Sequence, residues 1–392
     1  MKNNVESRQG DGRRVTIVSR LYRPEASAAS LRLGALVDGL RTRGNEVRVL
    51  TTRPPKSLRA HGSRERGVSS WPVLRDRSGY VRGYLQYMSF DIPLFLRVLF
   101  GRRSDVFVCE PPPTTGVALR LAAALRRTPY VYYAADIWSD AAAATEASGA
   151  ILRVLRGMER FAMRGAAVVL AVTDGVRTRV AELAPHADVQ VVGHGVDLSR
   201  FAAAGASVGT PADIVYVGSA SEWHGAELAL DVLADVMSED RTLTAAFIGQ
   251  GSSWPALKSE ARRRGLSARI RFFDTVGPEE AAAWLRSARV SLATLVPGQG
   301  YDFAVPTKLY ASVAVGTPVV YAGPPAVGEV IEENRIGAAA PYEHAPFAHA
   351  LRMALDAADG SPDRRLIDWA QQNLSAEEVA RRAGDAIEAV SR

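Results

Sequence analysis

Short apolar runs alternate along this chain with segments whose apolar residues recur at helical spacing. The runs of the first half lie at 15–19, 47–50, 105–108, 130–133 and 167–172. Between the first two runs, Leu33, Leu36, Val37 and Leu40 stand at i, i+3, i+4 and i+7 and therefore share one face of a helix. Apolar runs joined by amphipathic helices are typical of βαβ units, whose strands form parallel sheets. The pattern predicts an α/β fold.

The alternation is interrupted once and then begins again. Residues 202–212 (AAAGASVGTPA) are a small-residue stretch of the kind found at domain boundaries. The runs beyond this stretch lie at 214–218, 245–249, 270–273, 290–293 and 318–321. We therefore expect two Rossmann-like domains of similar size, with ligands at the carboxyl ends of the strands in a cleft between the domains. The polar, arginine-rich segment 53–82 is expected to be a long mobile loop.

Composition excludes several classes of protein. The chain has 392 residues, of which 47% are hydrophobic and 23% charged, and its one cysteine is Cys109. These values exclude overall disorder and an intrachain disulfide framework, and no cysteine or histidine pair has zinc spacing. No apolar run reaches the ~18 residues of a membrane span. Residues 1–12 are polar and are interpreted as a mobile tail rather than a signal peptide, which favours a cytoplasmic enzyme.

Charge is distributed unevenly between the two halves. Residues 1–200 contain 31 basic and 18 acidic side chains, a net charge of +13, whereas residues 201–392 have a net charge of −7. A basic half is typical of contact with phosphate, a membrane surface or nucleic acid. Codon bias explains the arginine excess equally well, because only Lys2, Lys56, Lys258 and Lys308 are lysines.

Several common enzyme motifs are missing. The turn after the first apolar run has no G-x-G-x-x-G fingerprint, and the chain has no Walker A loop, D-x-D pair or G-x-S-x-G elbow. Dinucleotide-dependent dehydrogenases, P-loop NTPases and α/β hydrolases are therefore disfavoured.

Two segments of the second half are candidate anion sites. Residues 218–225 (GSASEWHG) join a predicted strand to a helix that begins at about Ala226, so backbone N–H groups and the helix dipole could meet an anion there. An ordinary βα turn is the alternative. In the segment 305–320, Thr307 is the expected N-cap, and Lys308 in the first turn opposes the helix dipole. A bound phosphate would resolve this conflict; a solvated surface lysine is the alternative.

Two segments of the first half are candidate substrate sites. Asp136 follows the run at 130–133, where a carboxylate could accept a hydrogen bond from a substrate hydroxyl. Alternatively, Asp136 caps the next helix. The turn at 22–32, with Pro24 and a series of small residues, could bind an anion or a sugar.

The segment 87–103 is apolar and ends in Arg102 and Arg103. It could be an interfacial helix, with leucine and phenylalanine in the acyl boundary and arginine at the lipid headgroups. A core helix beneath the 53–82 loop is the alternative, which the aromatic spacing favours slightly.

The order and spacing of these segments resemble the family 4 retaining glycosyltransferases of the GT-B fold. The resemblance is carried by the first βαβ unit with LRTRGNEVRVLT, by SDVFVCEPPPTTG, VYYAADIWSD, VVGHGVDLSRF, VYVGSASEWHG and AAFIGQGSSWPALK, and by VPTKLYASVAVGTPVV. It extends over residues 13–390 and is most similar to the branch with a P-S-K-L motif, which contains amino-sugar and fucose transferases of bacterial surface polysaccharides.

The resemblance implies a particular domain organisation. Residues 1–12 would be the tail, 13–200 the acceptor-binding domain, 201–372 the nucleotide-sugar-binding domain, and 373–392 a C-terminal helix that packs back on the first domain. The activity would be transfer of a sugar from a nucleotide diphosphate sugar to an acceptor, with retention at the anomeric carbon and without a metal or other cofactor.

The resemblance also implies site residues. Lys308 would stabilise the leaving diphosphate and Asp136 would orient the acceptor, so these two are the catalytic candidates. The donor would be bound by Gly218, Ser219, His224, Gly225, Gly249, Pro306, Thr307, Lys308, Leu309 and Glu329. The acceptor would be bound by Pro24, Glu25, Ser27, Asp136 and Trp138.

The chain departs from the family pattern at several positions. Ser219 and His224 stand where many members have a basic pair, and Phe303 and Ala311 stand where the family has its E-x7-E acids. His194 replaces the usual asparagine, and Ser139 the proline that follows the tryptophan of the acceptor segment. These changes put the nucleotide, sugar and acceptor contacts in question more than the class of activity.

Other functions remain open from the sequence. A GT-B protein that binds a ligand or partner without turnover would show no slow hydrolysis of nucleotide sugars, and a nucleotide-sugar epimerase would form product without an acceptor. The acceptor could be a glycan, a lipid-linked intermediate or a small metabolite. The expected location is cytoplasmic, with peripheral contact at the inner face of an anionic membrane as an open alternative, and no nucleic-acid partner is expected.

Overall fold

The computed structural model describes residues 12–25, 27–55, 65–76, 81, 83–143, 148–299, 302 and 304–390. The described residues form two compact units. The first contains the described residues up to Ser139, together with 148–195 and 376–390, and the second contains 140–143 and 196–375. The predicted tail lies outside the described residues except for Gly12.

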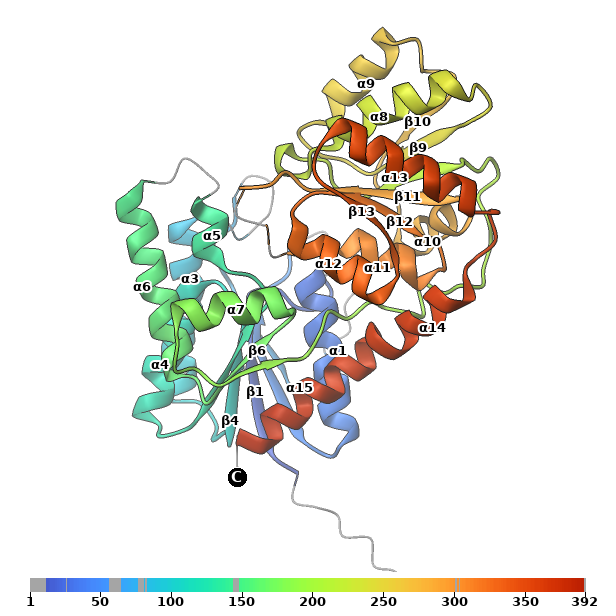
Figure 1. The fold of residues 1–392 in the computed structure, drawn as a ribbon. Helices are drawn as coiled ribbons and strands as arrows, with labels where there is room; N and C mark the ends of the chain where they lie inside the picture. Colours follow the sequence, from blue (N-terminus) through green and yellow to red (C-terminus); the bar gives the residue numbers. More distant parts are fainter. Residues whose placement is uncertain are drawn as a thin grey trace, which may run out of the picture. The chain divides into compact units, whose positions relative to one another are not determined.

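The first unit is built on a seven-stranded parallel sheet with the order β3-β2-β1-β4-β5-β6-β7 (Figure 1). Its strands are β1 (Arg14–Val18), β2 (Glu46–Thr52), β3 (Val68–Trp71), β4 (Val106–Cys109), β5 (Tyr130–Ala134), β6 (Val168–Ala171) and β7 (Val189–Val191). The helices of this half are α1 (Ala28–Thr42), α3 (Tyr84–Leu99), α4 (Pro113–Leu125), α5 (Trp138–Ala143), α6 (Gly149–Gly165), α7 (Asp174–Leu183) and α15 (Ala376–Val390).

The second unit is built on a six-stranded parallel sheet with the order β10-β9-β8-β11-β12-β13. Its strands are β8 (Ile214–Val217), β9 (Ala245–Ile248), β10 (Ile270–Phe273), β11 (Val290–Thr294), β12 (Val319–Ala322) and β13 (Gly337–Ala340). The helices are the 3₁₀ helix η1 (Glu222–His224), α8 (Ala226–Glu239), α9 (Trp254–Arg263), α10 (Pro278–Arg286), α11 (Thr307–Ala314), α12 (Pro325–Asn334), α13 (His344–Ala357) and α14 (Arg364–Asn373).

Both sheets confirm the predicted fold class, since each is a Rossmann-like α/β layer structure. In each sheet the strand order reverses beside the first strand, between β1 and β4 in one unit and between β8 and β11 in the other. Ligands of open α/β sheets bind at the carboxyl ends of the strands beside such a reversal. The topology therefore gives each unit one favoured position for a site.

Three edge strands were not predicted from the sequence. β3 lies within the segment expected to be a loop, β7 has only three residues, and β13 is formed by Gly337 and three alanines. Three of the four residues of β3 are exposed, so the segment has no apolar run that would reveal a strand. Residues 56–64, 77–80 and 82 of that segment lie outside the described residues.

Helix α15, the last element of the chain, packs against α1 in the first unit. Its buried face is made of small residues and two larger ones, Val379 and Ile387. Small residues on both helices allow a close approach, and a Cβ at Gly39 would lie 3.5 Å from the Cβ of Ala380. The end of the chain thus completes the core of the unit that holds its beginning.

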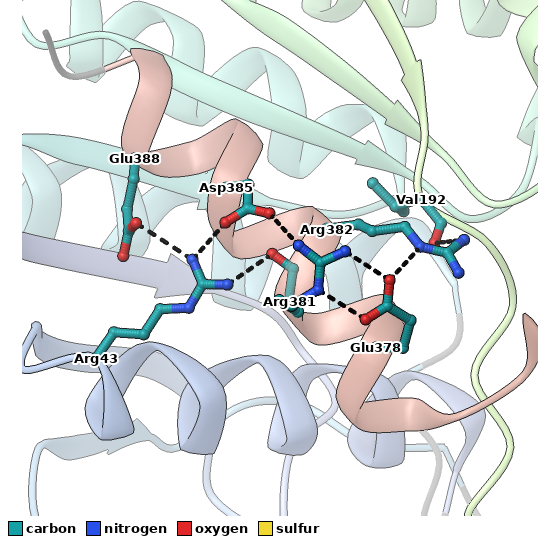
Figure 2. A network of polar contacts seen from close by, with 7 residues as sticks. All are labelled: Arg43, Val192, Glu378, Arg381, Arg382, Asp385 and Glu388. Carbon is teal, nitrogen blue, oxygen red and sulfur yellow. Dashed lines mark hydrogen bonds and ion pairs between the residues drawn. The ribbon is translucent and has the colours of Figure 1, made fainter. Parts of the chain in front are cut away.

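A polar network surrounds this contact (Figure 2). The Arg43 guanidinium donates to Asp385 at 2.8 Å, to Glu388 at 3.2 Å and to the Arg381 carbonyl at 3.0 Å. Arg381 donates in turn to Glu378 and Asp385. Most of these groups are open to water, where an ion pair contributes about 0–1 kcal/mol.

Burial rather than charge should therefore hold α15 in place. We expect Ile387→Ala to lower the free energy of unfolding of the first unit by about 2–4 kcal/mol, because its side chain is fully buried. Arg43→Ala should cost about 1 kcal/mol or less. Urea unfolding of both variants tests this order, and an equal or larger loss for Arg43→Ala would contradict it.

Candidate functional site

The loop that follows β8 in the second unit depends on glycine. Gly218 has a φ of +127° and Gly249, after β9, has a φ of +147°, conformations that side chains other than glycine rarely adopt. A Cβ at Gly249 would collide with the carbonyl oxygen of Gly218. The two glycines allow the loops after β8 and β9 to lie backbone against backbone at the carboxyl edge of the sheet.

Most amides of this loop already have protein acceptors. Gly218 N–H donates to the Ile248 carbonyl and Ala220 N–H to the Gln250 carbonyl. Within the described part of the chain, the Ser219 N–H has no hydrogen-bond acceptor, and Ser219 is exposed. The Ser219 N–H is therefore a backbone donor that a ligand could use in this loop.

His224 lies in the 3₁₀ turn before α8. Its Nδ1 accepts a hydrogen bond from the Ser221 N–H at 3.1 Å, so this nitrogen carries no proton. Burial, together with the nearby Lys308 ammonium, lowers the pKa of His224 to about 4. His224 is thus a neutral imidazole whose Nε2–H is a hydrogen-bond donor, and it does not replace a cation of the family's basic pair.

Lys308 is folded back over the end of β8. Its Nζ donates to the Tyr216 hydroxyl at 2.6 Å and to the Ser219 carbonyl at 3.0 Å. The same Nζ lies 3.9 Å from the centre of the Tyr216 ring, within cation–π distance. The residue is half-buried. Lys308 is therefore neither unpaired nor a solvated surface lysine.

The lysine's partners bring no negative charge. Removal from water lowers the pKa of Lys308 to about 7, because no carboxylate among the described residues pairs with the ammonium. An anion bound beside Tyr216 and Ser219 would supply the missing charge and raise the pKa again.

The start of α11 differs from the prediction for Thr307. The helix begins at Thr307 itself, with Pro306 in the N-cap position and no side-chain cap. Thr307 is consequently exposed in the first turn. Proline fixes φ near its helical value without needing an acceptor for an N–H, which explains why the cap falls one residue earlier.

The remaining donor-site candidates are in different environments. Leu309 is fully buried in the core, so its side chain cannot contact a ligand. Gly225 has a φ of +62° and its carbonyl accepts from the Tyr342 hydroxyl, which places it in a structural turn. Glu329 is exposed on α12. Ala311 lies on α11, whereas Phe303 falls outside the described residues.

In the first unit, a buried ion pair stands at the carboxyl ends of β1 and β4. Arg32 of α1 donates from Nη2 to Oε2 of Glu110 at 2.6 Å, and both side chains are less than a tenth exposed. The Ser19 hydroxyl donates to Oε1 of Glu110 at 2.7 Å. The guanidinium carbon of Arg32 also lies 5.1 Å from the centre of the Tyr133 ring.

Asp136 and His194 belong to the same charged neighbourhood. Partial removal from water raises the pKa of the Asp136 carboxyl, while Arg32 lowers it. Burial lowers the pKa of His194 to about 4, and Arg32 contributes in the same direction. Asp136 is exposed, and the loops after β1, β4, β5 and β7 thus place a cation, two carboxylates and a neutral imidazole at one edge.

Asp136 is not the cap of the next helix. The carboxylate of Glu159, a buried residue of α6, accepts hydrogen bonds from the backbone N–H of Trp138 at 2.6 Å and of Ser139 at 3.2 Å. Glu159 therefore satisfies the first amides of α5. The carboxylate of Asp136, at the end of β5, is therefore not needed to cap α5.

The other acceptor-site candidates have structural partners. Ser27 is the N-cap of α1 and accepts from the Ser30 N–H at 3.1 Å. Glu25 forms a half-buried ion pair with Arg75 at 2.9 Å, which ties the turn after β1 to the segment after β3. Pro24, which directly precedes Glu25, is exposed.

Trp138 lies in an aromatic group rather than alone. Its ring meets that of Tyr87 edge to face at 5.7 Å, and the Arg20 guanidinium lies 3.9 Å from the Tyr87 ring centre. The sequence analysis did not select Arg20, Arg32, Glu110 or His194 as site residues. Glu110 directly follows an apolar run, as Asp136 does, and that rule could have found it.

The Arg32–Glu110 pair yields a test of how this edge is held. Removing one partner leaves a buried charge unpaired, so Glu110→Leu should destabilise the first unit by about 3–5 kcal/mol. The double variant Arg32→Met/Glu110→Leu should recover most of that loss. Chemical unfolding of the three variants measures the coupling, and additive losses would mean that the pair is not a unit.

The described residues contain no group of three or more histidine, cysteine, aspartate or glutamate side chains arranged to hold a metal ion. Among the same residues, no helix is both long and apolar enough to cross a membrane.

Sequence families of glycosyltransferases match segments of both units. Residues 30–200 match the sequence family described as "Glycosyltransferase Family 4", and residues 211–357 match "Glycosyl transferases group 1". A glycogen synthase of Mycobacterium tuberculosis is 26% identical over 235 residues, which are 59% of this chain and 55% of that protein. The chain spans about half the length of the curated relatives it matches.

Solved structures share the fold over almost the whole chain. Sucrose-phosphate synthase from Thermosynechococcus elongatus superposes with a TM-score of 0.73 at 13% identity, over 96% of this chain and 98% of that one. Anabaena HepE in complex with UDP superposes with a TM-score of 0.71 at 16% identity, over 96% of this chain and 100% of that one. Each family model covers most of one unit, and together with the two Rossmann-like units the solved structures show that this chain has the GT-B fold.

Proposed function

We propose that this chain transfers a sugar from a nucleotide diphosphate sugar to an acceptor, with retention at the anomeric carbon and without a metal. The observation that carries the proposal is Lys308, a lysine without a carboxylate partner at the start of α11, folded over the end of β8 beside the strand-order reversal. A diphosphate is an anion whose charge this position would balance. The UDP complex of HepE, a protein of the same fold, supports a nucleotide donor.

Three groups of the second unit would act on the leaving diphosphate. Lys308 would supply positive charge, the Ser219 N–H a backbone donor, and the Nε2–H of His224 a neutral donor. Such preorganised donors stabilise charge that develops as the bond to the sugar breaks. Many family members have a basic pair at the positions of Ser219 and His224, and this chain does not. Its transfer rate would therefore depend on Lys308 more strongly than the rate of those relatives depends on any one of their cations.

Retention would follow a front-face route, as the resemblance to family 4 implies. The bond between the anomeric carbon and the diphosphate oxygen breaks, and the acceptor oxygen bonds to the same face of that carbon. The acceptor proton passes to an oxygen of the leaving diphosphate. No protein nucleophile is needed, and the protein's contribution is positional and electrostatic.

The first unit would bind the acceptor at the edge that carries Asp136. Asp136 would accept a hydrogen bond from the acceptor hydroxyl, and Arg32, held by Glu110, would set the local charge. Because a cation and carboxylates alternate there, a polyhydroxylated acceptor with amino or acidic groups fits this edge. The acceptor would be a glycan, a lipid-linked intermediate or a small metabolite, in surface-polysaccharide or specialised-metabolite synthesis.

Lys308 offers the sharpest test of the donor site. Lys308→Ala should lower the rate of transfer or donor hydrolysis by about 100-fold, whereas Lys258→Ala, a lysine of α9 in the same unit, should leave the rate unchanged. A panel of nucleotide sugars followed by product analysis would first identify the donor. An unchanged rate in Lys308→Ala would remove the phosphate assignment.

The lowered pKa of Lys308 gives the same test a pH dependence. Above pH 7 the free lysine has lost its proton, so binding of UDP must draw a proton from solution. Affinity for UDP should therefore fall between pH 7 and pH 9 in the native protein and change little in Lys308→Ala. Calorimetry at several pH values measures this. Binding of nucleotide sugars by the native protein without transfer or hydrolysis would instead indicate a GT-B protein that only binds its ligand.

Asp136 tests the acceptor site separately. Asp136→Asn should lower transfer by about 10-fold or more while donor binding stays near its native value, because the side chain is expected to orient only the acceptor. Asp174→Asn, at the exposed start of α7, is the control in the same unit. Equal losses of donor binding and transfer would contradict the acceptor role.

A further inference from the structure

The outer face of the first unit on the side of α3, α4 and α6 has an unusual composition. The three helices form one layer, since α4 packs against both α3 and α6, and Figure 1 shows them together on one side of the first sheet. Arg126, after α4, donates to the carbonyls of Val98, Leu99 and Gly101 at the end of α3. The layer is therefore a continuous structural surface.

Helix α3 is apolar on both sides. Its inner side buries Phe90, Leu94 and Val98, which is the core packing that the sequence analysis allowed. Its outer side carries a second apolar stripe of Leu85, Ile92 and Leu96, continued by Phe100. These four side chains are between 49% and 79% exposed.

The neighbouring helices carry further exposed apolar side chains. On α4, Leu121 and Leu125 are exposed one turn apart, and on α6, Ile151 and Val154 are exposed on one face. Several exposed large apolar side chains on one layer of helices are typical of an interaction site. Isolated exposed leucines would need no explanation.

The exposed charged side chains on these three helices are all arginines, and the loop after α3 adds Arg102, which lies 3.9 Å from the Glu46 carboxylate, and Arg103. Six exposed arginines lie on these helices or directly after them, namely Arg102, Arg103, Arg127, Arg153, Arg160 and Arg164. The acidic residues of α3, α4 and α6 are Asp91 and Glu159, and both are buried and hydrogen-bonded. Hence this face offers apolar side chains and positive charge, with no exposed carboxylate on the three helices.

We propose that the outer face of α3, α4 and α6 docks on an anionic lipid surface. Apolar side chains would enter the boundary between headgroups and acyl chains, and the arginines would contact the lipid phosphates. The partner is defined by charge complementarity, because a second copy of this chain would place arginines opposite arginines in a symmetric interface.

Vesicle binding tests this without any donor or acceptor, so its outcome is independent of the proposed transferase activity. The full chain should float with vesicles of phosphatidylcholine and about one third phosphatidylglycerol at about 0.05 M salt, and be released at about 0.5 M salt. It should not float with phosphatidylcholine alone. Failure to bind the anionic vesicles at low salt would overturn the proposal.

Two variants assign the binding to this face. Arg102→Gln/Arg103→Gln/Arg164→Gln should weaken binding to anionic vesicles by about 10-fold or more, and Ile92→Ser/Leu96→Ser should weaken it as well. The control Arg241→Gln/Arg262→Gln/Arg364→Gln removes the same charge from exposed sites of the second unit and should bind as the native chain does.

Each other result would contradict the assignment. Equal loss in the control variant would mean that net charge alone drives binding. Native binding by Ile92→Ser/Leu96→Ser would show a purely polyanionic contact, such as one with nucleic acid. A dimer in size-exclusion chromatography that the face variants dissociate would identify a second copy as the partner.

Discussion

Parallel strands buried on both faces leave a Rossmann-like sheet with few places for polar chemistry. In both units the strands are covered by helices, so most of their side chains are apolar and buried. Polar and charged groups reach solvent where the strands end, and the reversal of strand order opens space at that edge. Lys308 with Ser219 in one unit, and Arg32 with Glu110 and Asp136 in the other, occupy these positions.

The two units treat a poorly solvated cation differently. Arg32 pairs with the Glu110 carboxylate, which also accepts a hydrogen bond from the Ser19 hydroxyl, and it lies near the Tyr133 ring. Its charge is therefore balanced within the fold. Lys308 has only a hydroxyl, a carbonyl and a ring, and its pKa falls accordingly. A charge that the protein does not balance can be balanced by a ligand, whereas a paired charge chiefly positions its neighbours.

The glycines of the second unit show how local geometry supports this arrangement. Gly218 and Gly249 permit the loops after β8 and β9 to pack backbone against backbone. The residue after Gly218 is Ser219, whose carbonyl accepts a hydrogen bond from Lys308. A Cβ at Gly218 would also lie 3.3 Å from Cε of Lys308. The position of Lys308 thus depends on the absence of a Cβ at Gly218 as well as on the Tyr216 and Ser219 groups that accept its hydrogen bonds.

The hydrophobic pattern by itself determined the fold class and the course of the nine central strands and of the edge strand β10, because buried parallel strands need apolar runs and β10 has one. It did not reveal the edge strands β3, β7 and β13, since these three are short or partly exposed and have no such run. Local spacing likewise located Lys308 and Asp136 at strand and helix ends.

Only the tertiary structure decided what these residues contact. Three contacts show this. Lys308 bonds to Tyr216 and Ser219, Glu159 rather than Asp136 caps α5, and Glu110 pairs with Arg32. In each contact the two partners are at least 20 positions apart in the sequence. The presence of exposed apolar residues of α3, α4 and α6 in one layer depends on the packing of three helices. Periodicity records which face of one element is apolar, but the partner of a side chain across the fold is set by how the elements pack.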